Sequence, residues 1–199
     1  MKVIGITGGV GCGKSRVLAL LREKFGFICV EADLVAKEIQ EPGGSCYEES
    51  VKLLGRDILE PDGTICRKLM AERIFGDDVL REKVNSIVHP GVISEIKLKV
   101  ETAEVNGAEF IFVEAALLLE SGLSEICQEV WYVSCDYEVR VKRLMENRGY
   151  ERSKTDSIIR SQKSDAFFRE NCDEVIDNSG SYEELEEAVT DKIRKLRNR

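Results

Sequence analysis

The sequence predicts an α/β fold with a parallel five-stranded sheet flanked by helices, a helical insertion and a lid. Five short runs rich in β-branched and aromatic residues predict the strands, at 3–7, 27–31, 109–113, 130–134 and 174–177. Helical periodicity follows these strands, which favours a parallel sheet covered on both faces. In such a sheet, ligands bind beyond the carboxyl ends of the strands.

The helices are predicted from apolar spacing and from the residues that end them. Residues 15–25 carry four apolar side chains at helical spacing, and a short helix over 34–39 is stopped by Pro42 and Gly43. The stretch from 45 to 106 lacks strand-like alternation and is predicted to be helical. Its turns are predicted at Asp62-Gly63, Gly76 and His89-Pro90.

We expect a single domain, because no internal repeat and no linker rich in Pro, Gly or Ser interrupts the chain. The core is expected to cover about 1–40, 108–138 and 172–199, the insertion about 41–107 and the lid about 139–171. The insertion is the expected carrier of specificity for an acceptor molecule.

Composition limits the classes of function. The chain of 199 residues has 29 basic and 37 acidic side chains, a net charge of −8, which argues against a broad nucleic-acid or anionic-membrane surface. The longest apolar run after the amino-terminal segment, 110–119, is broken by Glu114 and is too short to span a bilayer. Seven scattered cysteines without a CxxC pair predict reduced thiols, so we expect a cytoplasmic protein.

A glycine-rich motif follows the first strand and precedes the first helix. Its sequence, GGVGCGKS, matches the GxxxxGK[ST] pattern of a phosphate-binding loop (P-loop) in the structural context that the pattern requires. Glycines let successive backbone N–H groups point into one cavity and bind phosphate oxygens. Lys14 is expected to reach the β- and γ-phosphates of ATP, and the Ser15 hydroxyl to bind Mg²⁺. The motif comprises Gly8, Gly9, Val10, Gly11, Cys12, Gly13, Lys14 and Ser15.

Cys12 lies where this loop enters its helix. A thiol at a helix N-terminus can have a lowered pKa, so we expect Cys12 to be sensitive to alkylation.

Two carboxylates follow predicted strands, and each has two interpretations. Asp33 either accepts the proton of an incoming hydroxyl group or caps the helix that follows, and its position alone favours the cap. Glu114 either binds Mg²⁺ through water or is an exposed carboxylate at a strand end.

The segment from 140 to 169 is locally basic, with nine basic against four acidic residues. We expect part of it to close over a polyphosphate, while the remaining charges form solvated pairs on helices. Arg143 and Arg148 are the preferred phosphate contacts. The basic residues are Arg140, Lys142, Arg143, Arg148, Arg152, Lys154, Arg160, Lys163 and Arg169.

Six segments occur in the order seen in dephospho-CoA kinases, and on them the chain resembles that family over nearly its whole length. They are VIGITGGVGCGKS (3–15), EADLVAKEIQEPG (31–43), LGRDILEPDGTICRKLM (54–70), VHP (88–90), EAALLLESGL (114–123) and VIDNSG (175–180). The resemblance implies ATP-dependent phosphorylation of the ribose 3′-hydroxyl of dephospho-CoA, the last step of coenzyme A synthesis.

The resemblance also implies roles for individual residues. Residues 11–16, which include Arg16, are expected to hold the ATP phosphates, and Asp33 is expected to be the catalytic base. Arg143 and Arg148 are expected in the lid. The expected cofactors are ATP and Mg²⁺, and the partner is a small molecule bound by a monomer or weak homo-oligomer.

Three further residues receive ligand-binding roles. Asn178 is expected near the adenine of ATP. His89 and Glu120 are expected to contact dephospho-CoA, although a lone histidine such as His89 is more often a packing or capping residue.

The chain departs from the family pattern at a few positions. Glu31 replaces the first aspartate of the usual DAD, Cys12 replaces a serine, and Arg16 replaces a threonine. The usual PLLFE reads ALLLE at 116–120. None of these changes removes a group that phosphoryl transfer needs, but they alter the expected wall of the acceptor site and the contact with the α-phosphate.

Two rival functions share the motif. A GTPase switch is suggested by DNSG at 177–180, which matches DxxG, but this segment comes too late in the chain and no NKxD motif is present. A kinase of the same fold acting on a nucleoside monophosphate or a sugar differs from the favoured function mainly in its helical block.

Overall fold

The computed structural model describes residues 1–198 and divides into two units. One comprises Met1–Cys29 together with the chain from Ala103 onward, and the other comprises Val30–Thr102. The second unit overlaps the segment for which the sequence predicts a helical insertion.

The five predicted strands form one sheet in the order β2-β3-β1-β4-β5. The central strand β1 (Lys2–Thr7) runs parallel to β3 (Phe110–Glu114) and to β4 (Glu129–Ser134). β5 (Glu174–Asp177) pairs in parallel with β4, and β2 (Ile28–Glu31) lies next to β3 in the strand order. The predicted fold class is confirmed, with every strand boundary within one residue of its prediction.

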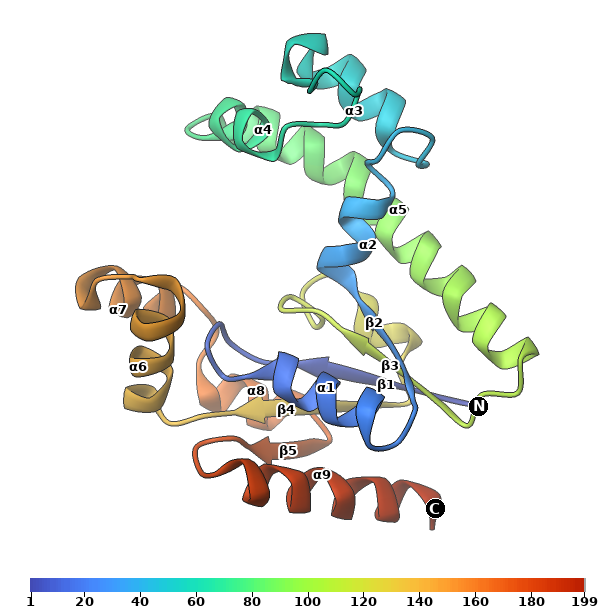
Figure 1. The fold of residues 1–199 in the computed structure, drawn as a ribbon, viewed down its shortest axis with the longest axis vertical. Coiled ribbons are helices and arrows are strands. Elements are labelled where there is room, and N and C mark those ends of the chain that lie inside the picture. The colour runs from blue at the N-terminus through green and yellow to red at the C-terminus, as the bar shows by residue number, and fades with distance from the viewer. Residues whose placement is uncertain (199) are drawn as a thin grey trace. The chain divides into compact units, whose positions relative to one another are not determined.

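The core of the first unit lies between the sheet and helices α1 and α9 (Figure 1). Ile4 and Ile6 of β1, Phe112 of β3, Trp131 of β4 and Leu185 of α9 are fully buried there. Each such side chain contributes about 1.5–3 kcal/mol relative to an exposed position. The helices of this unit are α1 (Lys14–Glu23), the 3-10 helix η2 (Leu123–Ile126), α6 (Tyr137–Arg148), α7 (Arg152–Arg160), α8 (Asp165–Asn171) and α9 (Tyr182–Arg197).

The opposite face of β4 packs against α8. Side chains alternate along a strand, so Tyr132 points away from the side occupied by Trp131. Its ring stacks on Phe168 with centroids 4.8 Å apart, and its hydroxyl donates to Asp165 Oδ1 at 2.9 Å. These contacts fix α8 against the sheet. They therefore also hold the carboxyl end of the connection between α7 and α8.

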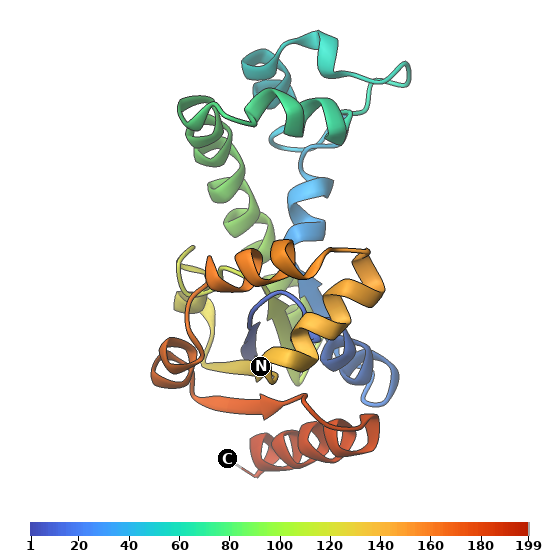
Figure 2. The same cartoon turned by 90° about the vertical axis from the view of Figure 1, so that its left-hand side faces the viewer.

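Helices α6 and α7 follow each other after β4, and Figure 2 shows them as consecutive yellow-orange and orange helices. Val141 and Leu144 of α6 pack with Ile159 of α7 in a small separate core. Gly149, in the left-handed conformation, ends α6 and permits the turn into α7.

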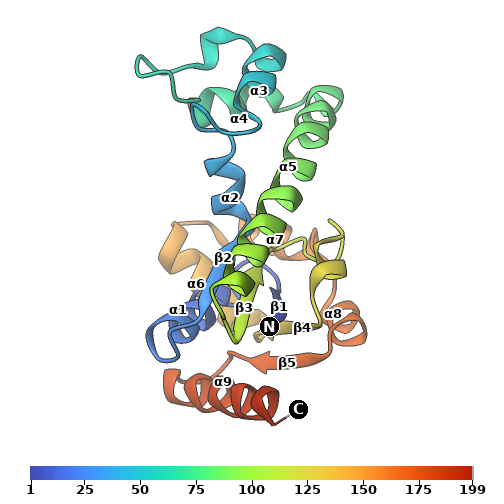
Figure 3. The same cartoon turned by 90° about the vertical axis from the view of Figure 1, so that its right-hand side faces the viewer.

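The second unit is helical (Figure 3). An isolated antiparallel bridge between Leu59 and Ile65 closes the predicted turn at Asp62-Gly63, and the turn at Gly76 also forms, so both predictions are confirmed. Its elements are α2 (Ala32–Glu38), α3 (Tyr47–Leu54), the 3-10 helix η1 (Arg56–Ile58), α4 (Arg67–Ile74) and α5 (Asp78–Val105).

The turn predicted at His89-Pro90 is wrong, because α5 continues through Pro90. A proline inside a helix removes one backbone hydrogen bond and crowds the preceding turn. An apolar stripe at four-residue spacing keeps the helix intact across it, since these side chains are all buried: Val84, Val88, Val92 and Ile96.

Gly91 allows a thiol to approach the backbone of α5 closely. The Cys46 thiol donates to the Ile87 carbonyl over 3.5 Å, and a Cβ atom at position 91 would lie 2.4 Å from its sulfur. A larger residue at 91 would push this contact apart.

Among residues 1–198, no helix combines the length and the apolar content needed to cross a bilayer.

Candidate active site

The GGVGCGKS segment forms a tight loop between β1 and α1. Gly8, Gly11 and Gly13 have φ angles of 146°, 82° and 89°, a region that side-chain-bearing residues rarely adopt. The Cys12 N–H donates to the Gly9 carbonyl at 3.2 Å, and α1 begins at Lys14. The first turn of α1 therefore opens directly from this loop, and its free N–H groups and dipole favour a bound anion.

Close packing around the loop also requires glycine. A Cβ atom at Gly13 would lie 2.1 Å from Asn178 Nδ2, and one at Gly9 would lie 2.3 Å from Arg140 Nη2. Side chains from α6 and from the end of β5 therefore approach the loop where glycines leave room for them.

Lys14 is held at the base of the loop by two oxygen atoms. Its Nζ donates to the Gly8 carbonyl at 2.9 Å and lies 3.5 Å from Glu114 Oε1. β3 pairs with β1 so that Glu114 stands opposite Ile6, and Glu114 is only 8% exposed. The interpretation of Glu114 as a solvent-exposed strand-end carboxylate is therefore wrong.

Ser15 and Arg16 occupy the first turn of α1 with exposed side chains. The Ser15 hydroxyl therefore stands in the position at a helix N-terminus from which P-loop proteins bind Mg²⁺.

Asn178 forms a hydrogen bond with the backbone of the loop. Its Nδ2 donates to the Cys12 carbonyl at 2.7 Å, and its backbone N–H donates to the Ser134 carbonyl at 2.9 Å. The residue is 1% exposed, and its Oδ1 has no hydrogen-bond partner among the described residues. In this structure the Asn178 side chain thus contacts the loop itself, whereas the sequence predicts a place near adenine.

The expected lowering of the Cys12 pKa is wrong. Burial raises the pKa of this thiol, while Lys14 and Arg140 pull it down by less. The side chain is 1% exposed, so removal from water outweighs the field of the helix N-terminus.

Arg143 and Arg148, the expected phosphate contacts of the basic segment, differ in solvent exposure. Arg143 is half-buried on α6 and its Nη1 lies 3.3 Å from Cys135 Sγ, at the end of β4. Burial raises the pKa of Cys135 despite this neighbouring charge, so the thiol is neutral near pH 7. Arg148 is the last residue of α6 and is exposed.

Three other predicted residues are solvent-exposed. Glu120 follows β3 in the first unit. Asp33 and His89 belong to the second unit, in the first turn of α2 and in the middle of α5. The N-cap of α2 is Glu31, so the interpretation of Asp33 as a helix cap is wrong.

Sequence reasoning missed a cluster of contacts at Val10. Gln162, in the connection from α7 to α8, accepts a hydrogen bond from the Val10 N–H at 3.0 Å, and Arg140 of α6 donates to the Val10 carbonyl at 3.0 Å. Arg140 was noticed only as one of nine basic residues. For Gln162 the sequence carries no signal, because its partner in the loop, the Val10 N–H, lies 152 residues away and is a backbone group.

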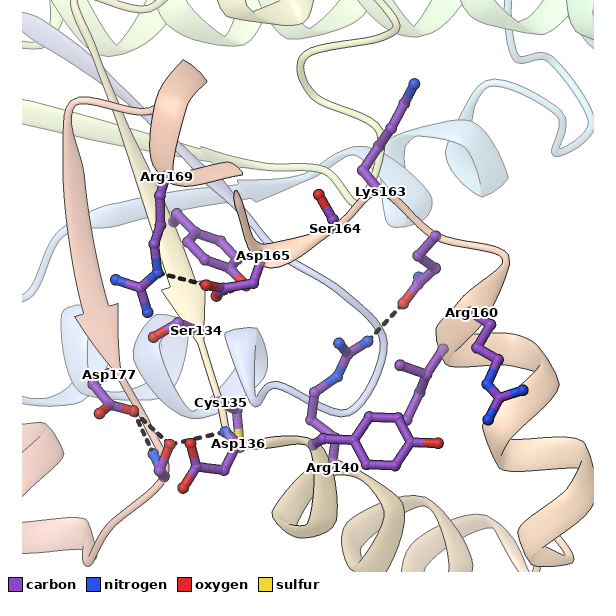
Figure 4. A pocket seen from close by; sticks show the side chains of 15 residues that line it. Ser134, Cys135, Asp136, Arg140, Arg160, Lys163, Ser164, Asp165, Arg169 and Asp177 are labelled. Atoms are coloured by element: carbon purple, nitrogen blue, oxygen red, sulfur yellow. Dashed lines mark hydrogen bonds and ion pairs between the residues drawn. The ribbon is translucent and has the colours of Figure 1, made fainter. Parts of the chain in front are cut away.

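Arg140 and Gln162 also line a cavity of about 430 Å³ beside the loop (Figure 4). Arg140 Nη2 donates a hydrogen bond to Gln162 Oε1 at 2.7 Å. In the close-up, Arg160 and Lys163 project from the neighbouring segment. Asp165 and Arg169 form an ion pair on the other side of the cavity.

A parallel sheet in this strand order, a P-loop opening into a helix, and a basic helical segment after β4 together define a P-loop kinase. The family model described as dephospho-CoA kinase matches residues 2–184. The chain belongs to the dephospho-CoA kinase family.

Individual proteins agree with this assignment. The chain is 38% identical over 186 residues to a dephospho-CoA kinase of Corynebacterium diphtheriae, covering 94% of this chain and 92% of that protein. A crystal structure of a Thermus thermophilus protein is similar with a TM-score of 0.80 at 30% identity, covering 98% and 97% of the two chains. The dephospho-CoA kinase structure from Campylobacter jejuni has a TM-score of 0.75 at 22% identity, covering 98% and 96% of the chains, which shows the shared fold.

Proposed function

We propose that this chain transfers the γ-phosphoryl group of ATP to the ribose 3′-hydroxyl of dephospho-CoA, giving coenzyme A and ADP. The observation that carries this proposal is membership of the dephospho-CoA kinase family over residues 2–184. The intact P-loop supports it, because each group that phosphoryl transfer requires from this loop is present.

The residues from Gly11 to Arg16 are proposed to bind the ATP phosphates. Successive N–H groups of the loop and of the first turn of α1 donate to phosphate oxygens. Lys14 is proposed to leave the Gly8 carbonyl and Glu114 and to bind the β- and γ-phosphates. It neutralises negative charge on these phosphates during the transfer.

The surroundings of Ser15 fit Mg²⁺. Its hydroxyl is exposed at the first turn of α1, and Glu114 lies beside Lys14 at the base of the loop. Mg²⁺ held there would supply positive charge close to the phosphates. Ser15 is the proposed direct ligand, and Glu114 is proposed to orient water molecules around the ion.

Asp33 is proposed as the catalytic base. Its carboxylate is exposed in the first turn of α2, and among the described residues it has no hydrogen bond or ion pair that would compete for an incoming hydroxyl group. Asp33 orients the ribose hydroxyl and accepts its proton as the oxygen attacks phosphorus in line with the leaving group. His89 and Glu120 are proposed to contact dephospho-CoA.

The basic segment is proposed to supply the remaining positive charge. Arg143 and Arg148 stabilise charge that develops on the transferring group, while Asn178 supports the loop near the adenine side of the site. The insertion is proposed to carry acceptor specificity. We also propose that the protein is cytoplasmic, which its seven free cysteines support. It is proposed to be a monomer or a weak homo-oligomer.

A coupled assay of ADP release tests the substrate. Purified protein is offered dephospho-CoA, AMP, CMP and gluconate in parallel with ATP and Mg²⁺. We expect turnover with dephospho-CoA alone. Turnover on AMP, CMP or gluconate at an equal or higher kcat/KM would assign the chain to the rival kinase class.

Asp33→Asn tests the mechanism. We expect it to keep ATP affinity and to lose turnover by at least about a hundredfold, the usual effect of removing a general base. Glu38→Gln, on the same helix α2, is the matched control and should keep turnover. Near wild-type turnover in Asp33→Asn would refute its role as the base.

A further inference from the structure

Val10 stands at the apex of the P-loop, and residues of α6, of α7 and of the α7–α8 connection hold its side chain, its N–H and its carbonyl. Its side chain packs on the cluster of Val141, Leu144 and Ile159. Its N–H donates to Gln162 Oε1 at 3.0 Å, and its carbonyl accepts from Arg140 Nε at 3.0 Å. Such complete engagement of one loop residue fixes both the position and the orientation of its peptide groups.

Arg140 and Gln162 also bind each other. Arg140 Nη2 donates to Gln162 Oε1 at 2.7 Å, so Arg140, Gln162 and Val10 form a closed ring of hydrogen bonds. Both partners of Oε1 are donors, so only the oxygen of the Gln162 amide satisfies them. A Cβ atom at Gly9 would lie 2.3 Å from Arg140 Nη2 and 2.9 Å from Gln162 Oε1. The ring of hydrogen bonds therefore requires glycine at position 9.

The Val10 N–H is thereby directed to Gln162. The nearby glycines make the loop intrinsically flexible, and an untethered apex would populate conformations whose amide groups do not converge on phosphate. Apparent affinity falls in proportion to the fraction of molecules in the competent conformation. A tether at the apex therefore raises ATP affinity without touching ATP.

We propose that Arg140 and Gln162 are positioning residues that act as one unit, fixing the apex of the P-loop through Val10 and so setting the affinity for ATP. This inference rests on the proposed function only for the identity of the nucleotide. Its effect is expected on ATP binding and not on the binding of dephospho-CoA.

The first experiment measures ATP·Mg²⁺ binding by calorimetry, together with KM for each substrate, in Gln162→Met, Arg140→Met and the double variant. Loss of hydrogen bonds of this kind corresponds to roughly a threefold to tenfold weakening. We expect each single variant to weaken ATP binding to that extent, with less than about a twofold change in KM for dephospho-CoA. We expect the double variant to be no weaker than the weaker single variant, because the ring is already broken.

Gln128→Met is the matched control. Gln128 Oε1 likewise accepts a backbone N–H, from Val3 at 2.6 Å, but at the opposite end of β1. We expect this variant to lower the melting temperature and to leave ATP binding unchanged. An equal loss of ATP affinity in Gln128→Met would show a general stability effect and overturn the proposal.

Arg140→Lys separates positioning from direct attraction of phosphate. Lysine keeps the charge but lacks the planar fork that reaches both Val10 and Gln162. We expect Arg140→Lys to bind ATP as weakly as Arg140→Met. Wild-type affinity in Arg140→Lys, or multiplying losses in the double variant, would overturn the proposal.

Hydrogen exchange at the Val10 amide, followed by NMR on the nucleotide-free protein, gives a readout that needs no turnover. We expect faster exchange in Gln162→Met than in wild type or Gln128→Met. An unchanged exchange rate at Val10 would contradict the tether. Because this readout does not depend on which acceptor the chain phosphorylates, failure of this inference is distinct from failure of the proposed function.

Discussion

The Lys14 ammonium group lies 3.5 Å from the Glu114 carboxylate, and both side chains are largely withdrawn from solvent. The pair joins the start of α1 to the end of β3. Glu114 thus holds the cation of the P-loop at the base of the site before any nucleotide arrives.

Glu114→Gln removes the charge of this pair while keeping its shape. We expect kcat to fall by roughly tenfold to a hundredfold, as for loss of a hydrogen bond to a charged group, and the Mg²⁺ concentration for half-maximal activity to rise. Steady-state kinetics over a Mg²⁺ titration measures both. Glu109→Gln, which affects an exposed carboxylate just before the same strand, should leave the titration unchanged. A Mg²⁺ dependence identical to wild type in Glu114→Gln would contradict the role of Glu114 near the ion.

Asn178→Ala leaves the buried Cys12 carbonyl without its donor. We expect a loss of about 1–3 kcal/mol in the free energy of unfolding, together with weaker ATP binding. Denaturant unfolding and calorimetry test the two effects. Asn171→Ala removes a similar bond to the Phe167 carbonyl at an exposed position and is the control. If the two variants lose equal stability and neither weakens ATP binding, Asn178 does not support the loop.

The Cys12 thiol should react slowly with iodoacetamide in the folded protein. Burial both raises its pKa and blocks access of the reagent. Peptide mass spectrometry of samples quenched over time reports the labelling of each cysteine. The same protein in guanidinium chloride provides the unprotected rate. Labelling of Cys12 at the same rate in both states would show that the loop opens readily.

The ion pair of Asp57 and Arg73 should contribute to stability only above acidic pH. The hydrogen bond from Arg73 lowers the pKa of Asp57 to about 2, below its value of about 3.9 in an unfolded chain. The stabilisation is therefore complete above pH ~4 and is lost as the pH falls through about 2. We expect the difference in unfolding free energy between wild type and Asp57→Asn to shrink across this window. In an Arg73→Met background the same substitution should show no such trend, and a persisting trend would assign the effect to another group.

The sequence was sufficient to predict the sheet. The three inner strands β1, β3 and β4 are buried apolar runs, which the sequence shows directly. The edge strands β2 and β5 are less buried, and their β-branched residues identify them. The P-loop was equally local, because its glycines, Lys14 and Ser15 are consecutive. Helix α5 was predicted less well: Pro90 suggested a turn, but packing of the apolar stripe outweighs the intrinsic cost of a proline in a helix.

The contacts around the P-loop could not be predicted, for a physical reason. The carboxamides of Gln162 and Asn178 bind backbone groups of Val10 and Cys12, and backbone groups have no sequence signature. The pKa of Cys12 depends likewise on burial by distant segments, which reverses the effect expected from the helix N-terminus alone.

Asn178 lies 166 positions after Cys12 in the chain, which imposes an order on events during translation. The phosphate-binding loop is synthesised before its supports, since these come from α6, from the α7–α8 connection and from the end of β5. A nascent chain carries the complete GGVGCGKS motif long before it can hold that motif in shape.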